Sequence, residues 1–303
     1  VKNLKAPLEQ SKPDLVFVHG DTTTTLTAAL ASFYADIPVC HIEAGLRTYD
    51  ISKPFPEEMN RQVVSKLTKF HFCPTEESKR NLLSEGIDQQ NIAVTGNTVI
   101  DTLHIAIEII KSDKNLEIGF QKKFQKKIAK NFLDEKYVLI TGHRRESFGA
   151  GFTSICEAIS KLADKFKDTR FIYPVHLNPN VQKPVNEILG KSENIHLIEP
   201  LEYLDFVYLL ENCYFVMTDS GGIQEEAPSL GKPVLVMRDK TERPEAIQAG
   251  TVKLVGSDFK KIYEGASELI NDETLYKKMS RSINPYGDGH ASERIREYIG
   301  KIK

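Results

Sequence analysis

Short apolar runs alternate with longer amphipathic stretches along almost the whole chain. The short runs are rich in β-branched and aromatic residues, as strands are, whereas residues 26–34, 76–85 and 152–166 have the length and periodicity of helices. Strict alternation of this kind predicts an α/β fold in which helices cover both faces of parallel sheets. The predicted strands are residues 15–18, 39–42, 70–73, 92–94, 137–141, 170–175, 195–198, 215–218, 233–237 and 252–255.

The alternation is interrupted between residues 98 and 131, where the pattern is helical only. We therefore predict a first Rossmann-like domain in residues 1–112, completed by a C-terminal helix in residues 286–303, and a second Rossmann-like domain in residues 113–285. Two such domains are expected to face a cleft that binds the ligand. Because the chain begins with Val1 and leads at once into a pattern typical of the middle of a domain, we expect the first domain to lack its natural front end.

Composition and charge exclude several classes of protein. The 303 residues carry a formal net charge of −2, and proteins whose main partner is nucleic acid usually show a clear cationic excess. The four cysteines are scattered without the CxxC spacing of a zinc site or redox pair, and no apolar run is long enough to cross a bilayer. We therefore expect no metal, no nucleic acid and no membrane partner. Cysteines placed in apolar segments suit a reducing compartment, so the expected location is the cytoplasm.

Acidic side chains lie at the ends of predicted elements in the first domain. Asp21 follows the first predicted strand, Glu43 follows the second, and Glu57 begins a helix after a proline. Because the carboxyl ends of parallel strands meet at one edge of a sheet, these three carboxylates could come together. Crowded carboxylates raise one another's pKa, which is how one site obtains both an acid and a base. The alternative is structural: Asp21 caps a helix, and Glu57 and Glu58 complement a helix dipole.

A glycine-containing loop in the second domain is suited to a phosphate. Residues 218–227 (TDSGGIQEEA) join a strand to a helix, so that the backbone N–H groups of Ser220, Gly221 and Gly222 would form an anion site. Glu226, one turn further on, could accept hydrogen bonds from a ribose diol. The pattern is neither GxGxxG nor a P-loop, so it indicates neither a dinucleotide nor ATP, and no cofactor is expected.

A second loop of this domain, residues 141–147 (TGHRRES), places one histidine and two arginines directly after a strand. His143 and Arg144 would there be suited to hold a diphosphate, since guanidinium groups bind phosphate oxygens in pairs. The alternative is an ordinary surface loop with ion pairs.

Eight blocks of the sequence, in order, resemble the non-hydrolysing UDP-N-acetylglucosamine 2-epimerase family. The resemblance covers essentially the whole chain and implies the two-domain fold called GT-B, in which the C-terminal helix returns to the first domain. The family opens with a strand and a Gly-Thr-Arg-Pro-Glu loop that this sequence lacks, so we expect the chain as given to bind UDP but to epimerise poorly. The blocks are residues 20–25, 41–48, 54–60, 96–101, 142–147, 173–176, 219–228 and 241–246.

The resemblance also implies roles for individual residues. The catalytic residues would be three carboxylates and a histidine near the departing diphosphate: Asp21, Glu43, Glu57 and His143. The residues that bind UDP would be Ser220, Gly221, Gly222, Glu226 and Arg243. A second, activating UDP-N-acetylglucosamine would be bound by Arg144 and His176 together with Glu57.

The activity that the resemblance implies is inversion at C2 of UDP-N-acetylglucosamine, giving UDP-N-acetylmannosamine for cell-surface polysaccharide synthesis. UDP would leave and add back without a redox cofactor, and the expected partners are this nucleotide-sugar and a second copy of the chain. Three alternatives remain: a C2 epimerase of a UDP-2,3-diacetamido uronic acid, a GT-B glycosyltransferase that uses a UDP-sugar, and a truncated chain that binds UDP-sugar without activity. Three carboxylates in the first domain favour an epimerase, because a transferase usually needs one base.

Overall fold

The computed structural model describes residues 1–142 and 149–302. The chain forms two compact units, one made of Val1–Thr102 with the segment from Pro285 onward, the other of Leu103–Asn284. The units divide inside helix α5 (Thr98–Ser112), whose last residue is the expected domain boundary. None of the helices within the described ranges is both long and apolar enough to cross a membrane.

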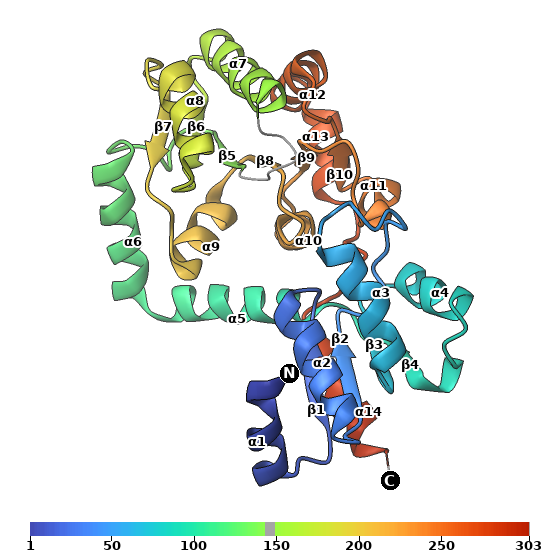
Figure 1. The fold of residues 1–303 in the computed structure, drawn as a ribbon. Coiled ribbons are helices and arrows are strands. Elements are labelled where there is room, and N and C mark those ends of the chain that lie inside the picture. Colours follow the sequence, from blue (N-terminus) through green and yellow to red (C-terminus); the bar gives the residue numbers. More distant parts are fainter. Residues whose placement is uncertain (143–148, 303) are drawn as a thin grey trace. The chain divides into compact units, whose positions relative to one another are not determined.

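Unit 1 is built on a parallel four-stranded sheet in the order β1-β2-β3-β4 (Figure 1). The strands are β1 (Val16–His19), β2 (Val39–Ile42), β3 (Phe70–Cys73) and β4 (Ile92–Val94), each within one residue of its predicted bounds. The helices are α1 (Lys2–Ser11), α2 (Thr23–Tyr34), α3 (Glu57–Leu67), α4 (Glu76–Ser84), the short 3₁₀ helix η1 (Gln89–Asn91), the start of α5, and α14 (Ala291–Gly300). Neighbouring strands pair in chain order, so every loop that follows a strand lies at one edge of the sheet.

Helix α14, near the C-terminus, packs on strands β2 and β3 from the N-terminal part of the chain (Figure 1). The Asp101 carboxylate accepts hydrogen bonds from the backbone N–H groups of Ala291 and Ser292, at 3.1 and 2.7 Å. These two N–H groups have no partner inside the helix, so the carboxylate supplies the missing acceptor and complements the helix dipole. The Tyr298 ring also packs edge-on against Phe72 of β3. A polar cap and an aromatic contact therefore attach the last helix to unit 1.

Unit 2 contains a parallel six-stranded sheet in the order β10-β9-β8-β5-β6-β7. The strands are β5 (Tyr137–Thr141), β6 (Arg170–Pro174), β7 (Ile195–Ile198), β8 (Phe215–Thr218), β9 (Val234–Val236) and β10 (Val252–Leu254). The helices are α6 (Lys114–Lys127), α7 (Ala150–Lys165), α8 (Pro179–Leu189), α9 (Tyr203–Asn212), α10 (Ile223–Ser229), α11 (Pro244–Ala249), α12 (Phe259–Asn271) and α13 (Glu273–Ser280). The expected α/β fold with two Rossmann-like units is confirmed.

The order of the strands reverses between β5 and β8. From β5 the chain proceeds outward through β6 and β7, and from β8 it proceeds outward in the other direction. The loop that follows β8 therefore begins at the centre of the sheet, where the strand order reverses and open α/β sheets bind their ligands. The loop after β8 begins at Asp219 and carries the glycine pair singled out in the sequence.

Two histidines lie buried side by side in the sheet of unit 1. His41 of β2 is paired in register with His71 of β3, and both are about 1% exposed. Burial lowers the pKa of His41 to about 4 and that of His71 to about 3, because the charged imidazolium loses its water. Each also has an Nδ1 atom without a hydrogen-bond partner among the described residues. Both rings are therefore neutral in the folded chain near pH 7.

We expect the stability of unit 1 to fall as the pH drops below about 6.5, the ordinary pKa of histidine in an unfolded chain. Between that pH and the lowered folded-state pKa values, the unfolded chain binds more protons, so each histidine costs about 1.4 kcal/mol of unfolding free energy per pH unit. Urea unfolding at pH 7, 6 and 5 measures this slope. His71→Leu should flatten it, whereas His104→Gln, on an exposed position of α5, should not. An unchanged slope in His71→Leu would contradict this account.

Candidate functional site

The loops after β1 and β2 meet at Gly20. The Gly20 backbone has φ +70, and a Cβ atom built there would lie 3.0 Å from Oε2 of Glu43. The Gly20 carbonyl is 2.8 Å from Nε2 of His41, and its N–H donates to the carbonyl of Ile42 at 3.0 Å. Only a residue without a side chain fits both the positive φ and the close approach of the carboxylate. This glycine therefore lets the Glu43 carboxylate approach the backbone of the loop after β1 closely.

Glu43 itself has an unusual backbone. Its φ is 66, in the left-handed region that costs a residue with a side chain roughly 1–2 kcal/mol. The carboxylate accepts a hydrogen bond from Nδ2 of Asn97 at 3.3 Å and lies 3.8 Å from Nε2 of His19. Strain of this kind persists where the surroundings over-determine a conformation, and such positions cluster at functional sites. The geometry therefore supports the choice of Glu43 as a site residue.

A buried arginine that the sequence reasoning missed lies next to Asp21. Arg61 of α3 is about 1% exposed, with Nη1 at 3.7 Å from Oδ2 of Asp21 and Nε at 3.5 Å from Oε2 of Glu58. None of its three guanidinium nitrogens has a hydrogen-bond partner in the part of the chain that the structure describes. A buried cation with unused donors is suited to receive ligand oxygens. The signal in the sequence was its spacing, one helical turn after Glu57.

The two glutamates that begin α3 have different surroundings. Glu58 is fully buried and accepts hydrogen bonds from the backbone N–H groups of Thr48 and Tyr49, at 3.0 and 3.1 Å. It therefore holds the loop after β2 in place, a structural task beyond complementing the helix dipole. Glu57 has a buried Oε2 atom without a hydrogen-bond partner among residues 1–142 and 149–302. Glu57 lies on the same face of α3 as Arg61. The contact described at Gly20 is made by Glu43.

In unit 2 the loop after β8 is covered by an arginine. A Cβ atom on Gly221 would lie 2.5 Å from Nη1 of Arg243, so a larger residue at this position would require the guanidinium to move. Arg243 is buried, with Nε 2.6 Å from Oε1 of Glu225, and it also pairs with Glu242. Glu242 in turn accepts from Nη1 of Arg238 at 3.1 Å. Two buried arginines and two buried glutamates therefore join the loop after β9 to helix α10.

The other predicted residues of this loop have mixed roles. The Ser220 N–H donates to Oγ1 of Thr218 at 2.9 Å, so this donor, which the sequence analysis assigned to an anion, has an internal acceptor. Gly222 precedes α10, which has seven residues. Glu226 is about 5% exposed and accepts a hydrogen bond from the phenol of Tyr203 at 2.9 Å. Burial raises the pKa of Glu226 to about 7, and the bond from Tyr203 opposes that rise.

The remaining predicted site residues are His143, Arg144 and His176. His143 and Arg144 lie outside the described residues. His176 follows β6 on an exposed position, and its Nδ1 atom accepts a hydrogen bond from the N–H of Asn178 at 3.1 Å.

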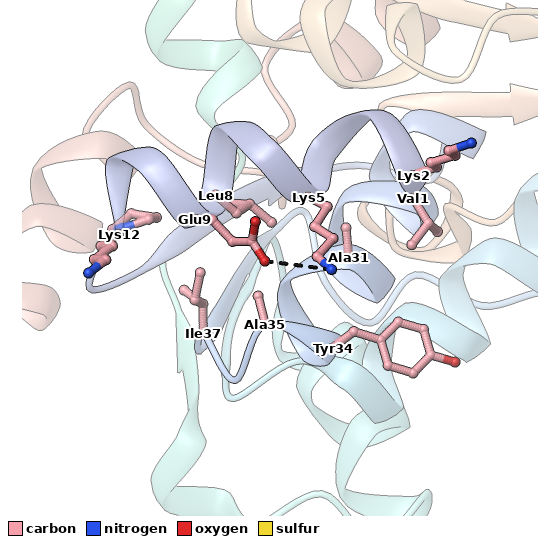
Figure 2. A pocket seen from close by; sticks show the side chains of 11 residues that line it. Val1, Lys2, Lys5, Leu8, Glu9, Lys12, Ala31, Tyr34, Ala35 and Ile37 are labelled. Atoms are coloured by element: carbon pink, nitrogen blue, oxygen red, sulfur yellow. Dashed lines mark ion pairs between the residues drawn. The ribbon is translucent and has the colours of Figure 1, made fainter.

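A pocket of about 580 Å³ lies between α1 and the end of α2 (Figure 2). Figure 2 shows an ion pair between Lys5 and Glu9 of α1 on one side, at 3.7 Å, and Tyr34 of α2 on the other. Its lining includes none of the predicted site residues. The candidate site is therefore defined by the loops at the strand ends.

Comparison with known proteins identifies the family. The model of the family described as UDP-N-acetylglucosamine 2-epimerase matches residues 1–300. The chain belongs to this family. The resemblance recognised in the eight sequence blocks is thereby confirmed, and with it the expectation of an isomerase with a GT-B fold.

Relatives match almost the whole chain. The UDP-N-acetylglucosamine 2-epimerase of Yersinia pestis is 54% identical over 297 residues, which are 97% of this chain and 77% of that protein. The crystal structure of the Neisseria meningitidis epimerase bound to UDP-GlcNAc has 53% identity and a TM-score of 0.94, covering 99% of this chain and 80% of that one. The S. aureus MnaA–UDP structure has 46% identity and a TM-score of 0.91, covering 98% and 78%.

We expect Gly221→Ala to destabilise this epimerase-family chain by about 1–3 kcal/mol, the usual cost of overpacking a filled site. The new methyl group would displace the Arg243 guanidinium from its two buried carboxylates. Gly222→Ala is the matched control, because its φ is −60 and its Cβ atom would meet only Oε2 of Glu226, at 3.8 Å. Urea unfolding compares the two. Equal stability of the two variants would show that Arg243 can move freely.

Proposed function

We propose that the chain catalyses the epimerisation of UDP-N-acetylglucosamine at C2, giving UDP-N-acetylmannosamine. The observation that carries the proposal is that, in a chain of this family, the Glu43 carboxylate closely approaches Gly20, the residue before Asp21. Two relatives support the ligand: the Neisseria meningitidis epimerase is bound to UDP-GlcNAc, and S. aureus MnaA to UDP.

The reaction proceeds by elimination and re-addition of UDP. The hydrogen on C2 of a hexose is only very weakly acidic, so its removal is coupled to departure of UDP. A carboxylate takes this proton while the C1–O bond breaks, and the electron pair of that bond leaves with UDP. A proton is then delivered to the other face of C2, and UDP adds back at C1. Asp21, Glu43 and Glu57 supply the acid and base groups. The buried guanidinium of Arg61 supplies a positive charge beside Asp21.

UDP binds to unit 2 in this proposal. Glu226 accepts hydrogen bonds from the ribose hydroxyls, and Ser220, Gly221 and Gly222 line the diphosphate. Arg243 is already paired with two carboxylates, so it acts by holding this loop as well as by its charge. We further propose that His143 interacts with the departing diphosphate. A charged, preorganised site of this kind stabilises the leaving group in the transition state.

We also propose a second ligand site and a dimeric assembly. Arg144 and His176, with Glu57, bind a second UDP-N-acetylglucosamine that activates the enzyme. The enzyme acts as a homodimer in the cytoplasm and supplies cell-surface polysaccharide synthesis.

We expect each of the variants Asp21→Asn, Glu43→Gln and Glu57→Gln to lower turnover at least about 10²-fold, because the amide keeps the shape and removes proton transfer. The assay is deuterium incorporation at C2 of UDP-N-acetylglucosamine recovered from D₂O. Glu76→Gln, on an exposed position in the first turn of α4, is the control and should exchange at the parent rate. Near-normal turnover in all three amide variants would favour a glycosyltransferase.

We expect Glu226→Ala to weaken UDP binding by about 1–3 kcal/mol, the cost of removing hydrogen bonds to a charged group. Titration calorimetry with UDP measures the change. Glu264→Ala, on an exposed position of α12, removes a similar side chain far along the chain and should bind UDP as the parent does. Equal affinity of Glu226→Ala and the parent would remove Glu226 from the nucleotide site.

A further inference from the structure

An accessible tyrosine covers the buried carboxylate of Glu226. Tyr203 is the first residue of α9 and is about 40% exposed, whereas Glu226 is about 5% exposed. The Tyr203 hydroxyl donates to Oε1 of Glu226 at 2.9 Å. The other carboxylate oxygen, Oε2, lies 3.8 Å from the point where a Cβ of Gly222 would be, so it faces the start of α10. One oxygen is therefore held from α9 while the other faces the glycine loop.

This arrangement fixes the direction in which the carboxylate accepts. An ionised carboxylate has about four lone-pair sites, and the phenol occupies one of them. A carboxyl group that turned freely would have to be ordered when a diol binds, and ordering costs affinity. The phenol also stabilises the ionised form, which burial disfavours.

The other charged groups near the start of α10 are paired with one another. Glu225, the neighbour of Glu226 on the same helix, is bound by Arg243, and Arg243 also pairs with Glu242 from the loop after β9. From α9, Tyr203 is the titratable group that contacts Glu226, and Glu202 before it is exposed. The phenol is therefore the contact that opposes the effect of burial on Glu226.

We propose that Tyr203 is a positioning residue for the nucleotide: its hydroxyl orients Glu226 and keeps it ionised, so that the carboxylate accepts from the ribose diol. The inference rests on the proposed function, because it assigns Glu226 to the ribose. Tyr203 acts through Glu226, so it affects binding of the nucleotide and leaves the chemistry at C2 unchanged.

The test is Tyr203→Phe, with binding of UDP measured by calorimetry between pH 6 and pH 9. Loss of the hydroxyl raises the pKa of Glu226, so affinity relative to the parent should fall roughly three- to tenfold at pH 7 and recover toward pH 9. The ratio to the parent cancels the titration of UDP itself. In the epimerase assay KM should rise while kcat stays constant, as for uniform binding of ground and transition states.

A second ligand distinguishes a specific effect on ribose binding from a general distortion of the nucleotide site. 2′,3′-Dideoxy-UDP lacks the ribose diol, so Tyr203→Phe should bind it as the parent does. Tyr276→Phe is the matched control, since it removes a phenol that donates to the carbonyl of Tyr214 at 2.9 Å, in the same unit. It should bind both ligands like the parent.

The outcomes distinguish this inference from the function on which it rests. A loss that is equal for UDP and its dideoxy analogue would overturn the role of Tyr203, whereas a diol-specific loss that is the same at every pH would mean that the hydroxyl orients Glu226 without controlling its ionisation. If Glu226→Gln weakens UDP while Tyr203→Phe does not, the positioning role alone is wrong. If neither variant affects UDP, Glu226 is not a nucleotide contact and the proposed function loses its UDP site.

Discussion

Both candidate sites depend on a buried guanidinium held between carboxylates. In unit 1, Arg61 lies between Asp21 and Glu58, and in unit 2, Arg243 lies between Glu225 and Glu242. Such groups are stable inside a protein only together, because removing one partner leaves an uncompensated buried charge that costs about 3–5 kcal/mol. Each arginine thus ties a loop after a strand to the first turn of a helix. The loops that carry the candidate site residues are in this way held by buried ion pairs.

Sheet topology decides where these loops lie. All strands of each sheet run parallel, so the residues that follow them gather at one edge. In unit 2 the order reverses between β5 and β8, and the glycine loop after β8 follows that point. In unit 1 the order is sequential, and a close approach at Gly20 brings the first two loops together instead.

Burial also sets the charge states in both units. His41 and His71 are neutral because their rings are enclosed in the sheet. Burial raises the pKa of Glu226 to about 7, so near neutral pH both its protonated and its ionised form are populated. The two histidines lie inside the sheet of unit 1. Glu226 lies at the proposed nucleotide site, where a single phenol shifts its balance toward the ionised form. Loss of water on burial thus shifts the pKa of two core histidines in unit 1 and that of the proposed ribose-binding glutamate in unit 2.

The sequence alone determined the α/β class, the strands to within about two residues, the family, and the positions of acids and glycines at strand ends. Those features are local, since periodicity and turn residues act over a few positions. Only the tertiary structure revealed the left-handed backbone of Glu43, the contact of Arg61 with Asp21, and the bond from Tyr203 to Glu226. Arg61 lies 40 residues after Asp21, and Tyr203 lies 23 residues before Glu226. Neither contact can therefore be detected from a short sequence pattern. Contacts of this kind depend on how packed elements direct their side chains, which no short stretch of sequence specifies.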